Sequence, residues 1–191
     1  MTETSADDRR AARYDAIARR FDDCVAGVTD WDAPTPVPEW RARDVVDHLA
    51  TWLPAFIASG STLRWEIGPG AASDPVATWR SLDAHVRGAL RDQADVPFSH
   101  ERIGDRPLGE VIDGFFVTDV LLHTWDLARA SGQDDTLDPV EVETLYAGMT
   151  GMADVIRSSG QFGVQQPVAA DAPVQDQLIA FIGRDPQWRH A

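Results

Sequence analysis

The segment Asp119-Val120-Leu121-Leu122-His123-Thr124-Trp125-Asp126 places a carboxylate and an imidazole four residues apart in an otherwise apolar stretch. In a helix, residues with this spacing lie above one another on one face. Another apolar stretch with helical spacing contains a second imidazole, His48. Two antiparallel helices could therefore bring His48, Asp119 and His123 to one point inside a bundle. Two nitrogens and one oxygen suit a divalent metal with coordination positions left open.

A metal site is one of two interpretations of this pattern. An aspartate and a histidine at this spacing occur often by chance. Asp119 and His123 could simply hydrogen-bond each other, and His48 could be a core histidine bonded to a backbone carbonyl. A metal has one argument in its favour, since a carboxylate on a core-facing helix is costly unless it is paired or bound to a cation. The same helix face carries the apolar residues Ile112, Phe115 and Phe116.

Asp126 lies one helical turn beyond this pair. It could accept a hydrogen bond from the ring N–H of a metal-binding histidine, or it could pair with Arg129, and the sequence favours neither. Cys24 lies on the apolar stripe of a predicted helix without a basic neighbour on that face, so we expect a buried, unreactive thiol. The remaining histidines are expected at the surface: His85, His100 and His190.

Apolar residues recur every three or four positions along most of the chain, which predicts an all-α bundle with long loops. The predicted helices cover residues 7–28, 41–59, 75–90, 108–130, 139–156 and 175–182. The fifth of these has an apolar stripe formed by Val142, Leu145, Met149, Met152 and Ile156. Length and composition predict a single domain, residues 1–191.

Two segments have no helical period. Residues 95–107 contain prolines and a glycine, so they predict an ordered loop or a short hairpin. Residues 158–173 are rich in Gly, Gln, Pro and Ala, and we expect a lid or a wrap held down by Phe162 and Val164.

The composition excludes several classes of partner. A formal net charge of −14, with scattered basic residues, would repel phosphate backbones and anionic lipids, so neither nucleic acid nor a membrane surface is expected. No run approaches the roughly 20 apolar residues of a membrane span, and residues 1–20 contain no apolar signal core. A cytoplasmic protein is therefore expected. A single cysteine cannot form an internal disulfide.

Three further segments carry a family resemblance: Val37-Pro38-Glu39-Trp40 followed by residues 43–49, then the segment from His123 to Ala130, and Gly183-Arg184-Asp185-Pro186. In these the chain resembles the DinB-like metal-binding proteins, in the branch similar to the N-terminal domain of mycothiol-dependent maleylpyruvate isomerase. The resemblance implies a DinB-like four-helix bundle with additional short helices. It also implies a divalent metal, usually zinc or nickel, held at the positions of His48, Asp119 and His123.

The resemblance further implies chemistry on a low-molecular-weight thiol. Characterised relatives use the metal to activate mycothiol or bacillithiol for thiol transfer or isomerisation. The isomerase carries glutamate at the position of Asp119, and its separate C-terminal domain has no counterpart in these 191 residues. Isomerase activity itself is therefore not implied.

The leading hypothesis is a metal-dependent enzyme, a monomer or a homodimer, that activates a mycothiol-like thiol for an electrophilic small molecule. The alternatives are a metal-dependent hydrolase of small substrates and a module that binds a metal or a ligand without catalysis.

Overall fold

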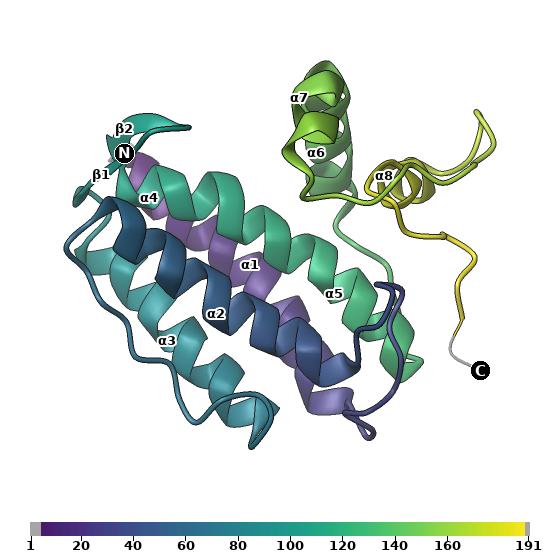
Figure 1. Cartoon of the computed structure of the whole chain (residues 1–191), viewed down its shortest axis with the longest axis horizontal. Coiled ribbons are helices and arrows are strands. Elements are labelled where there is room, and N and C mark those ends of the chain that lie inside the picture. Colours follow the sequence, from purple (N-terminus) through teal and green to yellow (C-terminus); the bar gives the residue numbers. More distant parts are fainter. Residues whose placement is uncertain (1–4, 190–191) are drawn as a thin grey trace.

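Four helices form a bundle in which two run in each direction, and a smaller group of helices lies beside it (Figure 1). The computed structural model describes residues 5–189; His190 lies outside the described residues. The first three bundle helices are α1 (Ala6–Gly27), α2 (Ala42–Gly60) and α3 (Pro75–Asp92). The fourth consists of α4 (Leu108–Val111), η1 (Ile112–Val117) and α5 (Thr118–Ser131). Helices α1 and α2 each pack against both α3 and α5, so the prediction of an all-α, DinB-like four-helix bundle is confirmed.

Local capping explains where these helices begin and end. Asp74 precedes Pro75, and its carboxylate accepts a hydrogen bond from the backbone N–H of Ala77 at 2.9 Å. Arg41 stands where α2 would be expected to have a hydroxyl cap, and the carboxylate of Asp44 instead accepts from the Arg41 N–H at 2.7 Å. Gly132 ends α5 with a φ of 67°, a left-handed cap that glycine adopts without steric cost.

The fourth bundle helix differs from its prediction at one point. The sequence predicts one regular helix over residues 108–130, whereas Ile112–Val117 form a π-helix between two α-helical parts. A π turn contains an extra residue, and such turns occur frequently at functional sites. Asp119 lies two residues after the last residue of this turn, Val117, so the π-helix sets the orientation of the helix face that carries it.

The core of the bundle determines which face of α2 remains open. Its buried stripe consists of Val45, Val46, Leu49, Leu53 and Ile57, all with no exposed surface. Trp52 and Phe56, predicted on the same stripe, are only partly buried. They therefore lie at the edge of the core, on the same side of α2 as His48.

A hairpin and a group of three helices complete the fold. Strands β1 (Pro97–His100) and β2 (Gly104–Pro107) form an antiparallel hairpin, the second of the two forms predicted for this segment. Helices α6 (Pro139–Gly151), α7 (Ala153–Ser159) and α8 (Val174–Phe181) follow the bundle, and α6 packs on α8.

This last region corrects two expectations. The predicted fifth helix is broken at Met152, which is 57% exposed rather than part of an apolar stripe. Val164 is 84% exposed, so it does not hold the 158–173 segment down; Phe162 does pack against the core. No helix within residues 5–189 has the length and apolar character needed to cross a membrane.

Candidate metal centre

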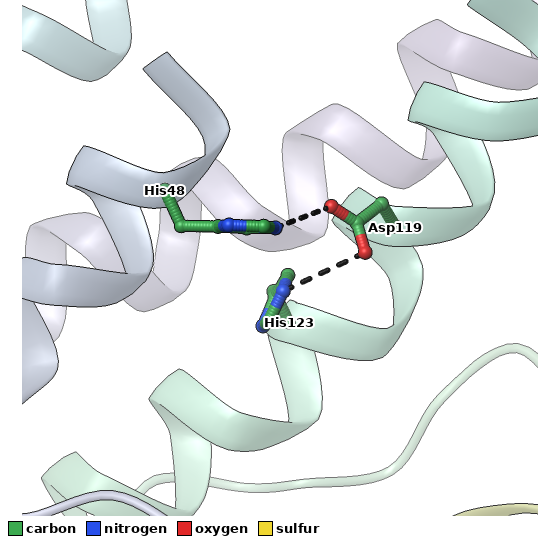
Figure 2. A group of neighbouring side chains, drawn as sticks. All are labelled: His48, Asp119 and His123. Atoms are coloured by element: carbon green, nitrogen blue, oxygen red, sulfur yellow. Dashed lines mark hydrogen bonds and ion pairs between the residues drawn. The ribbon is translucent and has the colours of Figure 1, made fainter. Parts of the chain in front are cut away.

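The three residues predicted as metal ligands lie together between α2 and α5 (Figure 2). Nε2 of His48 is 3.1 Å from Oδ2 of Asp119, and Nε2 of His123 is 3.5 Å from Oδ1 of the same carboxylate. One ligand atom from each residue lies within 4.8 Å of the other two. Within residues 5–189 no other group of three such side chains has this geometry. The structure thus brings together all three residues that the sequence singled out.

The donor set fits a divalent cation. With metal–nitrogen and metal–oxygen bonds of about 2.0–2.2 Å, neighbouring ligand atoms lie roughly 3.0–3.5 Å apart around one ion. The distances from Nε2 of His48 and Nε2 of His123 to the Asp119 carboxylate, 3.1 and 3.5 Å, fall in this range. Two imidazoles and a carboxylate suit zinc and nickel better than magnesium or calcium, which prefer oxygen alone. These residues could therefore hold zinc or nickel.

A buried carboxylate sets the orientation of His123. Oδ2 of Asp126, which has no exposed surface, is 2.9 Å from Nδ1 of His123. The neutral ring therefore carries its proton on Nδ1 and leaves the lone pair of Nε2 facing Asp119. Of the two roles considered for Asp126, the structure has the first, because Arg129 instead forms an ion pair with Asp135.

Asp126 is neutralised by the C-terminal segment of the described chain. Arg184 donates from Nη2 to Oδ2 of Asp126 at 3.0 Å and from Nε to Oδ1 at 3.3 Å. Burial alone would raise the pKa of Asp126, but the Arg184 charge and the His123 hydrogen bond outweigh it and hold the pKa below its ordinary value. Asp126 therefore remains a carboxylate beside His123.

Asp119 is likewise stabilised in its charged form. Burial raises its pKa, whereas the neighbouring His123 and the hydrogen bonds from His48 and Trp52 lower it, and the net direction is downward. The Trp52 indole donates from Nε1 to Oδ2 at 2.8 Å. A carboxylate that stays ionised and fixed in position is what a cation site requires.

A second tryptophan covers the two imidazoles. The Trp40 ring stacks on His123 with centroids 5.6 Å apart and an interplanar angle of 20°, and its centroid is 5.0 Å from that of His48. Trp40 ends a turn in which its N–H donates to the carbonyl of Val37, and Glu39 adopts a φ of 68° within it. A non-glycine residue at such a φ is strained, and strain of this kind concentrates at functional sites.

The site nevertheless has an open side. The side chains of His48 and Asp119 are 33% and 22% exposed, whereas His123 is 4% exposed. A cation held by these three residues would thus be reached from the surface through His48 and Asp119. An ion in this position would keep room for a water or a substrate beside its protein ligands.

The other candidate residues lie elsewhere. His85 places Nδ1 against the carbonyl of Ser81, and His100 lies in the hairpin beside Phe56; both are partly exposed, and neither joins the cluster. Cys24 is fully buried in the core, and burial raises the pKa of its thiol to about 11. The expectation of an unreactive cysteine agrees with this environment.

Three residues of the site were not identified from the sequence. Trp52 could have been found, because it follows His48 at the i,i+4 spacing that puts both on one helix face. Trp40 and Arg184 both lie in segments that carry the family resemblance, yet no spacing rule links them to the metal ligands. Arg184 is 58 residues from Asp126, and only the fold brings the two together.

Comparisons with known proteins identify the family of this chain. The family model of the mycothiol maleylpyruvate isomerase N-terminal domain matches residues 14–128, which include all three candidate ligands. The uncharacterized proteins Rv0738 and MT0763, from two strains of Mycobacterium tuberculosis, are each 34% identical over 160 residues, covering 79% of this chain and 83% of theirs. No solved structure matches significantly. The chain belongs to the family of the mycothiol maleylpyruvate isomerase N-terminal domain, in agreement with a DinB-like helical fold.

Proposed function

We propose that the protein is a metal-dependent enzyme that activates a low-molecular-weight thiol, similar to mycothiol, for transfer to or isomerisation of a small electrophilic molecule. The observation that carries this proposal is the convergence of two imidazoles and one carboxylate on a point that is open on one side. Membership of a family named for a mycothiol-dependent reaction supports the choice of a thiol as cosubstrate.

His48, Asp119 and His123 would hold the ion, and zinc or nickel suits their donor atoms best. When bound there, a divalent cation lowers the pKa of a thiol that reaches it, so that the thiolate is available near neutral pH. The side chain of Asp119 is shorter than that of glutamate, and the Trp52 indole, which donates to Oδ2 at 2.8 Å, holds it at the cluster.

The chain's own residues would orient this site and keep it partly dry. Asp126 holds the His123 proton on Nδ1, away from the ion, so that Nε2 keeps its lone pair. Arg184 fixes Asp126, and the Trp40 ring excludes water from one face of both imidazoles. The thiol and the electrophile would therefore approach from the side on which His48 and Asp119 are exposed.

Elemental analysis of untagged protein, combined with calorimetric titration of mycothiol, tests the proposal. Wild type is expected to hold one equivalent of zinc or nickel and to bind mycothiol only when the metal is present. His123→Ala should lose both properties, and His85→Ala, a histidine outside the cluster, should keep both. A folded His123→Ala variant with full metal content would overturn the assignment, and thiol binding that is independent of metal would overturn the mechanism.

Turnover assays with and without thiol separate the proposal from a metal-dependent hydrolase. Conversion of an electrophilic substrate should require the thiol. Equal conversion in its absence would favour hydrolysis.

A further inference from the structure

A row of rings leads away from the candidate metal centre. We use the name aromatic row for five side chains, Trp52, Phe56, Phe98, His100 and Phe115. Phe56 is at its centre, with ring centroids 6.0 Å from Trp52, 5.9 Å from Phe115, 5.3 Å from His100 and 5.1 Å from Phe98. The row begins at Trp52, whose indole donates to the candidate ligand Asp119.

The spacing along two helices makes the row continuous with the metal ligands. On α2, His48, Trp52 and Phe56 follow one another at intervals of four residues. On the facing helix, Phe115, Asp119 and His123 do the same. Because α2 packs against α5 and also against β1, these two stripes have the metal ligands towards one end and rings towards the other. Figure 1 shows the hairpin at the end of the bundle towards which the rings extend.

The row is accessible although its rings are apolar. Phe115 is 39% exposed, and Trp52, Phe56 and His100 are partly exposed. Single exposed apolar side chains are common, but contiguous exposed rings frequently indicate a binding site.

The π-helix fixes the position of Phe115. In η1, Phe116 is buried against Trp52 and Tyr14, while its neighbour Phe115 remains at the surface against Phe56. Asp113 in the same turn is held by Arg13, which donates to its carboxylate at 2.7 Å and to its carbonyl at 3.0 Å. An anchored π-helix that presents a ring beside the candidate site is consistent with a functional role for that ring.

We infer that the aromatic row binds the electrophilic substrate through a planar, uncharged, aromatic or conjugated group of that substrate. This inference rests on the proposed function and adds the substrate class to it. Ring faces and edges bind flat apolar groups by stacking and edge contacts. Of the five side chains of the row, only His100 can carry a charge, so the row provides no fixed partner for a carboxylate or a phosphate.

The reaction expected for such a substrate balances without a further reagent. With 1-chloro-2,4-dinitrobenzene, the thiolate sulfur bonds to the ring carbon that carries chlorine. The carbon–chlorine bond then breaks, chloride leaves with the electron pair, and the thiol proton goes to solvent. Iodoacetamide accepts the same thiolate at its methylene carbon with loss of iodide, and it has no ring for the row to bind.

A binding experiment tests the row without any chemistry. The uncharged dye N-phenyl-1-naphthylamine is titrated into the full-length protein, and its fluorescence gives a dissociation constant. Phe115→Ala should weaken binding on the order of tenfold, Phe115→Leu should weaken it less, and Val155→Ala should leave it unchanged. Val155 is an exposed apolar residue on α7 and serves as the matched control. Equal binding by wild type and both Phe115 variants would overturn the inference.

A kinetic experiment then connects the row to substrate selection. The ratio of kcat/KM for 1-chloro-2,4-dinitrobenzene to that for iodoacetamide is measured on metal-loaded protein with mycothiol. Phe115→Ala should lower this ratio about fivefold to tenfold with little change for iodoacetamide. An unchanged ratio would overturn the assignment to the substrate.

The two proposals fail in different ways. His123→Ala should abolish metal uptake yet still bind the dye, because Phe56 and Phe115 remain in place. Loss of dye binding in Phe115→Ala, together with absence of metal from wild type, would refute the thiol chemistry while leaving the apolar binding surface intact. Normal metal and thiol binding with no effect of Phe115 would refute the aromatic row alone.

Discussion

Replacing Asp126 by asparagine should weaken both the fold and the metal site, because this one carboxylate joins His123 to Arg184. Asp126 has no exposed surface and accepts from His123 Nδ1 at 2.9 Å and from Arg184 Nη2 at 3.0 Å. Removing one member of a buried ion pair costs about 3–5 kcal/mol. Asparagine keeps one acceptor oxygen, so we expect a loss of unfolding free energy near the lower end, about 3 kcal/mol.

The effect on metal binding follows from the tautomer of His123. An amide can donate to Nδ1 as well as accept from it, so the proton of His123 is no longer held away from Nε2. Loss of such a partner typically reduces metal affinity about 10–100-fold. Chelator competition measures the affinity, and guanidinium unfolding measures the stability. Asp92→Asn, which removes an exposed acid, should change stability by less than about 0.5 kcal/mol and leave affinity unchanged.

A variant of Arg184 separates the orientation of the His123 ring by Asp126 from a general loss of stability. Arg184→Met keeps the Asp126 carboxylate beside His123 but removes its cation. Stability should fall by an amount similar to that in Asp126→Asn, whereas metal affinity should fall less, since the acceptor for Nδ1 remains. Our reasoning would be refuted if folded Asp126→Asn bound metal as tightly as wild type, or if Arg184→Met lost more affinity than Asp126→Asn.

Three further changes test other parts of the account. Trp52→Phe removes the Nε1–H that donates to Asp119 but keeps a ring, so metal affinity should fall with a stability loss of about 1–3 kcal/mol; unchanged affinity would mean that this hydrogen bond does not position the carboxylate. The Cys24 thiol has its pKa raised from 9.0 to about 11, so its contribution to stability is complete below pH 9 and is lost as the pH rises through 11. Cys24→Ala should therefore lose less unfolding free energy than wild type between pH 9 and 11. Equal losses in the two proteins would contradict the raised pKa of the Cys24 thiol. Glu39→Gly relieves the strain at φ 68° and should raise the free energy of unfolding by about 0.5–1 kcal/mol without changing the fluorescence of the stacked Trp40; a destabilised variant would show that the turn is not strained.

Much of the fold and three residues of the site could be predicted because their signals are local. Helical spacing of apolar residues located the bundle helices, Gly132 marked a helix end, and the four-residue interval put Asp119 and His123 on one face. Pairing these with His48 needed only the expectation that two antiparallel helices meet. The helix positions, the helix end and the Asp119–His123 interval depend on residues within a few helical turns, whereas His48 lies 71 residues from Asp119 in the sequence.

The features that the sequence did not predict depend on contacts between distant segments or on small differences in energy. The contact of Arg184 with Asp126 spans 58 residues, and no periodic pattern indicates which carboxylate an arginine will meet. The π turn before Asp119 has the same apolar composition as a regular helix, so periodicity could not distinguish the two. Met152 fits an apolar stripe by spacing, yet α6 ends at Gly151 and a separate helix, α7, begins at Ala153.

X-ray absorption spectroscopy of the zinc-loaded, untagged protein tests the central claim most directly. Two imidazole nitrogens, at least one carboxylate oxygen and one or more exchangeable solvent oxygens should surround the ion at about 2.0–2.2 Å, and His48→Ala should remove one imidazole from the spectrum. A spectrum with four protein ligands and no exchangeable oxygen, or one unchanged in His48→Ala, would contradict an open site formed by His48, Asp119 and His123.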